Sequence, residues 1–412
     1  MVGEETTPAV PDPMATQVRH PVWLPAVRPP GARTFSLLYA LESIARASIS
    51  SVIPIQAYDL LRDEQQVSML YTLVALLGLS ATLFMPMAIA RFARRYVYTA
   101  GVAALMAGSL AFLADTLPSQ IAGMLLRVMG ASALSITLNL YIMDHIRKSE
   151  FVSAESARMA WSTLSWTGGP ALGVFLYSHY GLWAAHAVVL VSATVLLALF
   201  WYFRLSDNIA IRPGKTRPAN PLANIGRFVR QPRLRLAWLI AFGRSCFWTT
   251  FFVYGPILMV ATGEGELAGG LLVSAGNALL FTALIWGYAG KRFGARNVMA
   301  GAFFVLAAML FFAGMAGEAA PRIAAGFLLA SAFFAIALDA LGSTAFMRAV
   351  RSFERPQMAA VYRTYLDLSE LLPPLAYSVV LAFFGLGAVF VTLSLFCAVC
   401  GVVTFRYLPK SM

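Results

Sequence analysis

Charged side chains are scarce in this chain of 412 residues, where they make up only 12% of the positions. Soluble domains carry about a quarter of their residues as Asp, Glu, Lys or Arg. Hydrophobic residues fill 59% of the positions instead. Such a chain has too few charges to cover a water-exposed surface, so the composition excludes a soluble globular protein.

Cysteine and histidine are also rare, with three and four copies. Cys246, Cys397 and Cys400 all lie in apolar runs, which excludes the disulfide framework of a small secreted domain. Cys397 and Cys400 have the C-x-x-C spacing, but no second pair of ligands follows, and the histidines show no ligand spacing. We therefore expect no metal and no cofactor. No nucleophile, base and orienting group can be assembled either, so the sequence does not indicate an enzyme.

Apolar stretches of membrane-spanning length fill most of the chain. A helix needs about 20 mostly apolar residues to cross the hydrocarbon core. Six such stretches precede a polar, proline-rich segment, and six follow it. We expect spans at 35–57, 67–89, 97–114, 119–143, 157–178, 182–203, 236–260, 267–289, 298–316, 322–346, 357–382 and 386–407. The sequence predicts an all-α membrane protein with one six-helix bundle at 35–203 and another at 236–407.

The polar segments indicate how the chain is oriented in the bilayer. Residues 1–34 are rich in proline and are predicted to be a disordered tail, 204–235 a basic central loop, and 408–412 a short tail. Lys and Arg gather in the tails and in alternate connections, whereas the other connections hold only Arg62 and Arg322. Because cytoplasmic loops collect basic residues, both termini are expected to be cytoplasmic, in a bacterial inner membrane. This asymmetry explains the net charge of +12 without nucleic acid.

An internal repeat supports two related halves. The run 43–54 aligns with 245–256, the basic loop 91–95 with 292–296, and Pro170 and Gly181 with Pro374 and Gly385. All three matches are separated by roughly 200 residues, as expected for halves related by a pseudo-two-fold axis.

The chain, including this internal repeat, resembles the major facilitator superfamily. The family's loop between helices 2 and 3 reads roughly Gly-x-x-x-Asp-Arg-x-Gly-Arg-Arg and aligns with 86–95 and 287–296. Its acidic position is replaced by Ala90 in the first half and by Lys291 in the second, so the charge latch of the family is in doubt. The resemblance implies a role in gating for the basic residues Arg91, Arg94, Arg95, Arg292 and Arg296.

A second resemblance lies in the fifth span. Gly169, Pro170 and Gly173 are similar to the Gly-Pro-x-x-Gly motif of proton-driven exporters of the family, although Ser165 and Val174 stand where glycine is usual. The alternative is a tight helix-packing site with a proline kink, since small residues and proline are common in membrane helices. The sequence leaves both interpretations open.

The resemblance implies that spans 1, 4, 7 and 10 surround a central cavity. Arg46, Arg127 and Arg244 lie near mid-depth in three of these spans. A charge there costs about 2.5–3.5 kcal/mol, so such a residue usually faces water or a partner. Arginine binds carboxylate or phosphate in a bidentate manner, and organic-phosphate antiporters of the family use arginines on helices 1 and 7 similarly. Other candidates for substrate binding are Glu42, Tyr71, Trp248 and Asn277, with Trp166 and Tyr365 among further aromatic residues that could line the cavity.

Structural ion pairs are the alternative role for these charges. Glu42 stands one turn before Arg46 and could pair with it or with Arg127, and Arg244 could pair with Asp339. Such pairs would stiffen each half without binding a substrate.

Carboxyl groups in the later spans are candidates for proton coupling. Asp367 and Glu370 share one helix face, where burial and mutual repulsion favour protonation, and Asp339 is a third candidate. Their alternative role is an ion pair with Arg363 and a loop base.

These features predict a secondary transporter that moves a small solute by alternating access, as a monomer in the lipid bilayer. Proton-coupled export of an amphipathic compound is the first expectation. Uptake or exchange of an organic anion held by the mid-depth arginines is the second. A membrane assembly or sensor protein that transports nothing is a third possibility, and it would need no accessible charged cavity.

Overall fold

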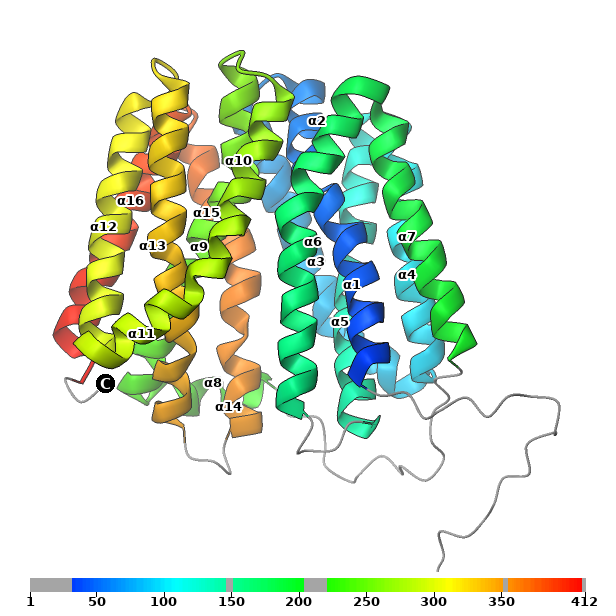
Figure 1. The fold of residues 1–412 in the computed structure, drawn as a ribbon, viewed down its shortest axis with the longest axis horizontal. Coiled ribbons are helices and arrows are strands. Elements are labelled where there is room, and N and C mark those ends of the chain that lie inside the picture. The colour runs from blue at the N-terminus through cyan, green and yellow to red at the C-terminus, as the bar shows by residue number, and fades with distance from the viewer. Residues whose placement is uncertain (1–31, 146–150, 204–220, 351–354, 410–412) are drawn as a thin grey trace, which may run out of the picture.

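The computed structural model describes residues 32–145, 151–203, 221–350 and 355–409 (Figure 1). Within these ranges the chain forms helices and no strands. Most of the tail expected at 1–34, much of the loop expected at 204–235 and residues 410–412 lie outside the described ranges.

The first half consists of seven helices. They are α1 (Ala32–Ser48), α2 (Val52–Leu61), α3 (Glu64–Arg91), α4 (Arg94–Phe112), α5 (Leu117–His145), α6 (Phe151–Tyr180) and α7 (Leu182–Tyr202). Helix α4 packs against α5, and α1 packs against α6 and α7. Between them, Tyr98 stacks on Phe200 with the ring centroids 4.2 Å apart, and both side chains are buried. The centre of this half is therefore closed by apolar packing.

The second half follows the same plan with two broken helices. Its elements are α8 (Pro221–Val229), α9 (Pro232–Ala261), α10 (Glu266–Ala278), the 3₁₀ turn η1 (Leu279–Thr282), α11 (Ala283–Phe293), α12 (Ala295–Ala316), α13 (Pro321–Ala349), α14 (Arg355–Tyr362), α15 (Thr364–Val380) and α16 (Gly387–Tyr407). Helix α12 packs between α13 and α16. A Cβ atom on Gly387 would lie 2.5 Å from the Gly314 carbonyl oxygen, so glycine permits this close approach of α16 to α12.

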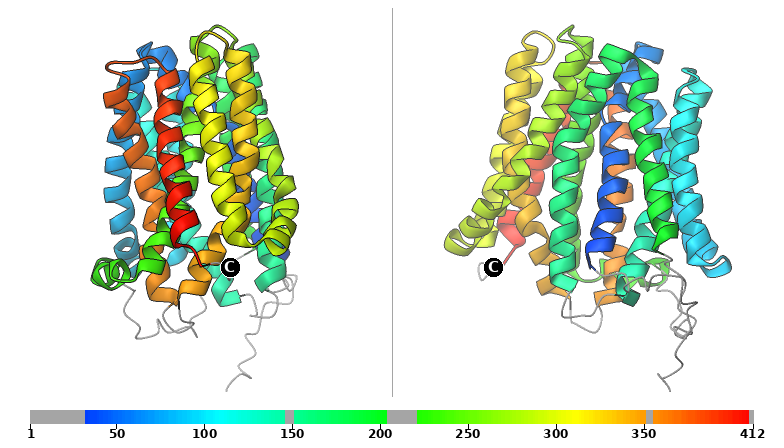
Figure 2. Two further views of the ribbon diagram at one scale, coloured as in Figure 1. Left: turned by 90° about the vertical axis from the view of Figure 1, so that its left-hand side faces the viewer. Right: turned by 45° about the vertical axis from the view of Figure 1, so that its right-hand side comes forward.

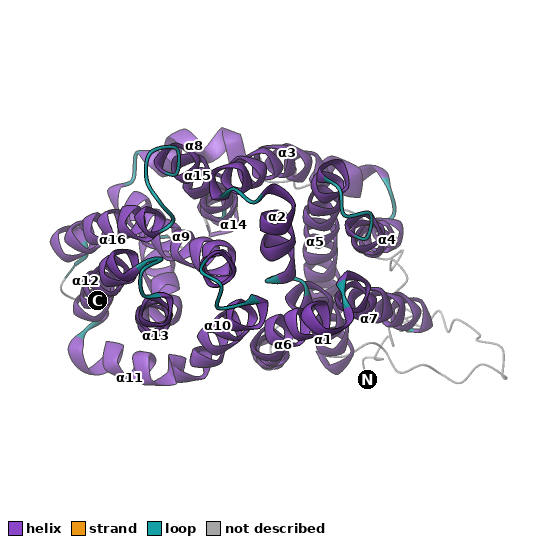
Figure 3. Cartoon of the chain, turned by 90° about the horizontal axis from the view of Figure 1, so that it is seen from above, coloured by secondary structure: helices purple, strands orange, loops and turns teal. Residues whose placement is uncertain are grey.

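The helices run between two faces of the molecule (Figures 1 and 2). The described chain begins and ends at one face, which we call the terminal face, and we call the opposite one the far face. Seen from above, the halves lie side by side (Figure 3). They meet where α6 packs on α10, α3 on α15 and α2 on α9. The predicted fold class, twelve spans in two pseudo-symmetric bundles, is confirmed. By length and composition alone, seven helical segments of the described chain could cross a membrane.

The first span is broken where the sequence predicted one continuous helix. Helix α1 ends at Ser48 and α2 begins at Val52. The Ser50 hydroxyl donates to the Ala47 carbonyl at 2.8 Å, and Pro54 has no N–H to continue the helical ladder. The aligned span, α9, contains Pro256 and stays continuous, so the break distinguishes the halves.

Part of the predicted central loop is helical. Helix α8 occupies Pro221–Val229, and Phe228 at its end is buried. Helix α9 then begins at Pro232, a residue favoured in the first helical turn because its missing N–H is not needed there. The second bundle thus starts slightly earlier than the predicted 236.

Candidate functional site

Arg244 is held in an interhelical ion pair. Its Nη1 lies 2.7 Å from an Asp339 carboxylate oxygen, and its Nη2 donates to the Tyr365 hydroxyl at 3.1 Å. The other Asp339 oxygen accepts a hydrogen bond from Trp248 Nε1 at 2.8 Å. The ion pair and these hydrogen bonds therefore connect helices α9, α13 and α15. The Arg244–Asp339 pair that the sequence allowed is present.

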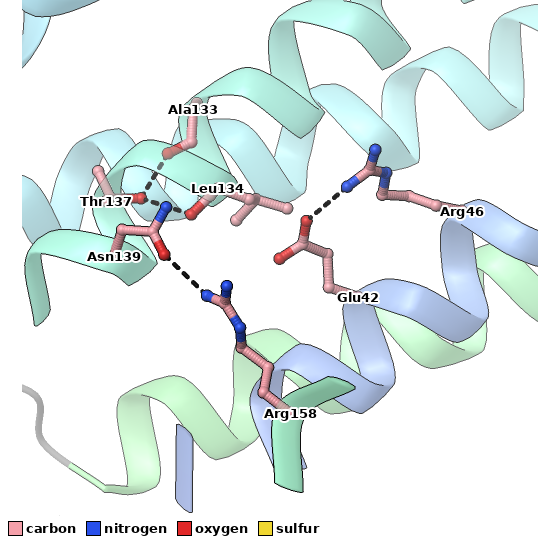
Figure 4. Close-up of polar contacts among 7 residues, drawn as sticks. All are labelled: Glu42, Arg46, Ala133, Leu134, Thr137, Asn139 and Arg158. Carbon is pink, nitrogen blue, oxygen red and sulfur yellow. Dashed lines mark hydrogen bonds and ion pairs between the residues drawn. The ribbon is translucent and has the colours of Figure 1, made fainter. Parts of the chain in front are cut away.

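Glu42 and Arg46 form a second pair within α1 (Figure 4). Arg46 Nη1 lies 3.1 Å from Glu42 Oε1, with the Glu42 side chain fully buried and that of Arg46 31% exposed. Glu42 lies between Arg46 and Arg158, and Glu42 Oε2 has no hydrogen-bond partner among the described residues. Arg158 donates to Asn139 Oδ1 at 2.7 Å and sits over the Tyr39 ring.

Arg127 has no such partner. Its guanidinium makes no hydrogen bond or ion pair with the residues that the structure describes, and its Nε is buried. Two charged side chains act on it, Arg46 by repulsion and Glu370 by attraction, and the neutral phenol of Tyr71 lies near it. We call Arg46, Tyr71, Arg127 and Glu370 the central cluster. It draws on α1, α3, α5 and α15, and so on both halves.

Glu370 of the central cluster lies at the boundary between the halves. Its side chain is exposed, and Arg127 and Arg46 of the other half attract it. Asp367 lies one turn away and repels it. Within the described residues, neither carboxyl makes the ion pair with Arg363 that the sequence allowed.

Aromatic rings border the same boundary. The Trp166 ring of α6 lies 5.6 Å from the Phe252 ring of α9, and Phe252 lies 5.7 Å from Trp248. All three side chains are partly exposed. Trp166 and Trp248 were candidates from the sequence, but Phe252 was missed. Its position one turn after Trp248 was the available signal.

Asn277 is not part of this arrangement. It is buried, and its amide donates to the Val273 carbonyl of its own helix at 2.9 Å. It lies in the last turn of α10, just before the 3₁₀ turn.

The Gly-Pro segment of α6 forms a packing junction. A Cβ atom on Gly173 would overlap the Ser48 carbonyl oxygen, and one on Gly169 would lie 2.7 Å from the Ala47 Cβ. Helix α6 thus fits against the end of α1, directly before the break in the first span. On another side, a Cβ on Gly270 of α10 would lie 2.8 Å from the Val174 Cβ.

The predicted gating arginines lie at two connections on the terminal face. Arg91 ends α3, and Arg94 and Arg95 begin α4. Arg95 sits over the Tyr96 ring, whose centroid is 4.9 Å from its Cζ. In the second half, Arg292 sits over the Phe293 ring, and Arg296 Nε donates to the Phe405 carbonyl at 2.9 Å. The observed partners of Arg95, Arg292 and Arg296 are therefore rings and a main-chain oxygen.

Comparison with known proteins gives one family and several similar folds. The sequence profile described as Major Facilitator Superfamily matches residues 35–281. No curated protein matches the sequence. The structure is similar to that of a mutant form of the nucleoside transporter NupG, with a TM-score of 0.69 and 13% identity over 92% of this chain and 100% of that one. A bacterial homologue of the iron transporter ferroportin in an inward-facing state gives 0.69 and 15%, over 91% and 99%. A D-xylose–proton symporter gives 0.67 and 14%, over 92% and 97%.

Proposed function

Because this chain belongs to the major facilitator superfamily, we propose that it is a secondary transporter that carries a small organic anion together with protons by alternating access. The anion is a carboxylate or a phosphate, and Arg127 binds it between the two halves. Glu370 carries the coupled proton.

The observation that carries this proposal is the uncompensated charge of Arg127. Arg244 and Arg46 each have a carboxylate partner, whereas Arg127 has none among the described residues. An unpaired charge away from bulk water is costly unless it faces water or binds a counter-ion. Its guanidinium can make two parallel hydrogen bonds to a carboxylate or phosphate. The anion thus supplies the partner that the protein lacks.

Coupling follows from the place of Glu370 in the same cluster. When Glu370 is ionised, it attracts Arg127 and repels an incoming anion. When Glu370 is protonated, Arg127 remains as an uncompensated positive charge. Proton binding therefore strengthens anion binding, and linkage requires the reverse as well. Two ligands that help each other to bind are expected to move together, as in a symporter.

The contacts between the halves support alternating access. The Ser68 and Tyr254 hydroxyls are 2.6 Å apart across the boundary near the far face, and the Ala171 amide donates to Ser274. We assign this closed side to the exterior and the terminal face to the cytoplasm, because basic residues gather in the tails and connections of the terminal face. With the far face held closed by these contacts, we propose that the site is reached from the cytoplasm.

A second candidate is proton-driven export of an amphipathic compound. The Gly-Pro segment and the aromatic rings at the boundary between the halves favour it. In this case the substrate would compete with the proton for Glu370, so proton binding would weaken substrate binding.

Transport by reconstituted protein distinguishes the two. Purified protein in proteoliposomes is tested with lactate, benzoate and inorganic phosphate under an imposed pH gradient. Symport predicts that each transported anion accumulates on the side toward which protons flow, and that Arg127→Gln abolishes this. Arg322→Gln is the matched control, because its arginine is exposed and bonded to Glu264 near the far face. Movement against the proton flow would support export, and protein that moves no probe would support a sensor or assembly role.

A further inference from the structure

We infer that the anion carries an aromatic ring, and that the site holds it with its charged end toward α1 and α5 and its ring against α9 and α6. This inference rests on the proposed function and specifies the substrate class of that site.

The two walls of the site differ in charge. On the second-half wall, Arg244 is neutralised by Asp339, and the carboxyls Asp367 and Glu370 are accompanied by one cation, Arg363, beside Asp367. On the first-half wall, Arg127 has no ion-pair partner among the described residues, and Arg46, paired with Glu42, is partly exposed. The named charges therefore leave the first-half wall net positive and the second-half wall net negative. The negative end of a bound molecule must point to α1 and α5.

Aromatic rings line the boundary between the halves at α9, mostly from the second half. Trp248 and Phe252 stand one turn apart on α9, and Trp166 approaches Phe252 from α6. The indole N–H of Trp248 is bonded to Asp339, so its polar edge is satisfied and its orientation is fixed. Because these three rings remain partly exposed, they can stack on or contact the edge of an incoming ring.

The internal repeat places the two walls opposite each other. The register that aligns 43–54 with 245–256 makes Arg46 and Trp248 equivalent positions in the first spans of the two halves. A pseudo-two-fold axis sets equivalent positions across the central site from one another where both face the axis, and both Arg46 and Trp248 keep exposed surface. Arg46 therefore presents a cation, and Trp248 presents an indole ring. A ligand that satisfies both has an anionic group and a flat apolar body on opposite ends.

Simpler ligands use only part of this site. A short anion such as acetate would leave the rings in contact with water, and an aromatic cation would meet the charge of Arg127. A saturated ring would fill the space but would lack the edge-to-face and stacking geometry available to an aromatic one.

Binding of four probes to the purified full chain tests the inference by isothermal titration calorimetry. The probes are benzoate, cyclohexanecarboxylate, acetate and benzyl alcohol. Benzoate is expected to bind most tightly, about tenfold more tightly than acetate, since aromatic pairs and ring burial together contribute at least one factor of ten. Phe252→Leu should weaken benzoate binding several-fold and leave acetate binding unchanged. Phe311→Leu, which removes an exposed ring from α12, should change neither.

The outcomes separate this inference from the function on which it rests. If cyclohexanecarboxylate binds as tightly as benzoate, or if Phe252→Leu weakens acetate and benzoate equally, the aromatic inference is wrong and anion binding stands. If neither a carboxylate nor inorganic phosphate binds, the proposed function itself fails. Size-exclusion chromatography shows whether Phe252→Leu is folded. If Phe252→Leu does not fold, Trp166→Phe replaces it in the test. This variant keeps a ring at the same boundary and should retain the preference for benzoate.

Discussion

The backbone amide of Ala171 donates a hydrogen bond to the Ser274 hydroxyl across the boundary between the halves, at 2.9 Å. In an undisturbed helix this amide would bond to the carbonyl four residues earlier. Pro170, directly before it, lacks an N–H and distorts the helical ladder of α6. The distortion at the proline thus leaves the Ala171 amide available to donate to the Ser274 side chain of α10. Because α6 and α10 belong to different halves, this bond exists only while they are close together.

Ser274→Ala removes this bond and should favour opening of the far face. A neutral hydrogen bond contributes about 1 kcal/mol, which corresponds to roughly a fivefold change in the ratio of closed to open protein. Spin labels at Gln66 and Phe384, both exposed and in different halves, report the ratio through electron–electron distance distributions. Ser378→Ala is the control, since that hydroxyl bonds within its own helix to Leu375. An unchanged distribution in Ser274→Ala would show that the bond does not hold the face closed.

Two glycines of α6 should respond oppositely to substitution by alanine. A Cβ on Gly173 would overlap the Ser48 carbonyl, whereas one on Gly168 meets no atom within 4 Å. Gly173→Ala should destabilise the protein by about 1–3 kcal/mol because the backbones must separate. Gly168→Ala should be neutral or gain up to about 1 kcal/mol from helix propensity. Thermal unfolding in detergent measures both, and equal shifts would contradict the packing role of the junction.

The sequence predicted the spans better than their interruptions. Spans are set by apolar composition over many residues, which a single sequence shows directly. The breaks before Val52, at 279–282 and at Arg363 depend on local hydrogen bonding and on neighbouring helices, so composition does not reveal them. The chain instead provided Pro54 and the serines near it, which are signals compatible with either a kink or a break.

The sequence indicated candidate residues for the site but not their pairing. The depth of a residue in the membrane follows from counting residues along the helix. This count placed Arg46, Arg127 and Arg244 near mid-depth. Whether each has a partner depends on how the helices are rotated and tilted against each other. The sequence allowed Glu42 to pair with either Arg46 or Arg127, and only the structure shows that Arg127 is the one left without a carboxylate at ion-pair distance among the described residues.

Breaking the Arg244–Asp339 pair from one side should cost more than removing both charges. Arg244→Gln leaves Asp339 without its cation, and we expect a loss of about 1–3 kcal/mol, less than for a fully buried pair because both side chains are partly exposed. Combining it with Asp339→Asn should recover part of the loss. Thermal unfolding of the two single variants and of the double variant checks this. Additive losses in the double variant would indicate that the groups stabilise the bundle independently.

Glu42→Gln should strengthen anion binding while lowering stability. The substitution removes the carboxylate that neutralises Arg46, so Arg46 adds its charge to that of Arg127 in the central cluster. Calorimetric titration with benzoate should show a dissociation constant that falls several-fold, with the enhancement reduced at high salt because exposed charges are screened. Weaker binding would mean that Glu42 orients Arg46 for the ligand and does not merely neutralise it.

Glu370→Gln should uncouple transport from the proton gradient. Glutamine resembles a protonated carboxyl in shape and charge, so Arg127 stays uncompensated at every pH and the anion still binds. Proteoliposomes with this variant should exchange labelled for unlabelled substrate at near the native rate, yet fail to accumulate it when a pH gradient is imposed. Glu264→Gln is the control, because that carboxyl pairs with the exposed Arg322 near the far face. In the native protein, acidification should strengthen anion binding by protonating Glu370, and this pH dependence should disappear in the variant. Gradient-driven accumulation by Glu370→Gln at the native level would assign the proton to another group, of which Asp367, one turn away, is the first to test.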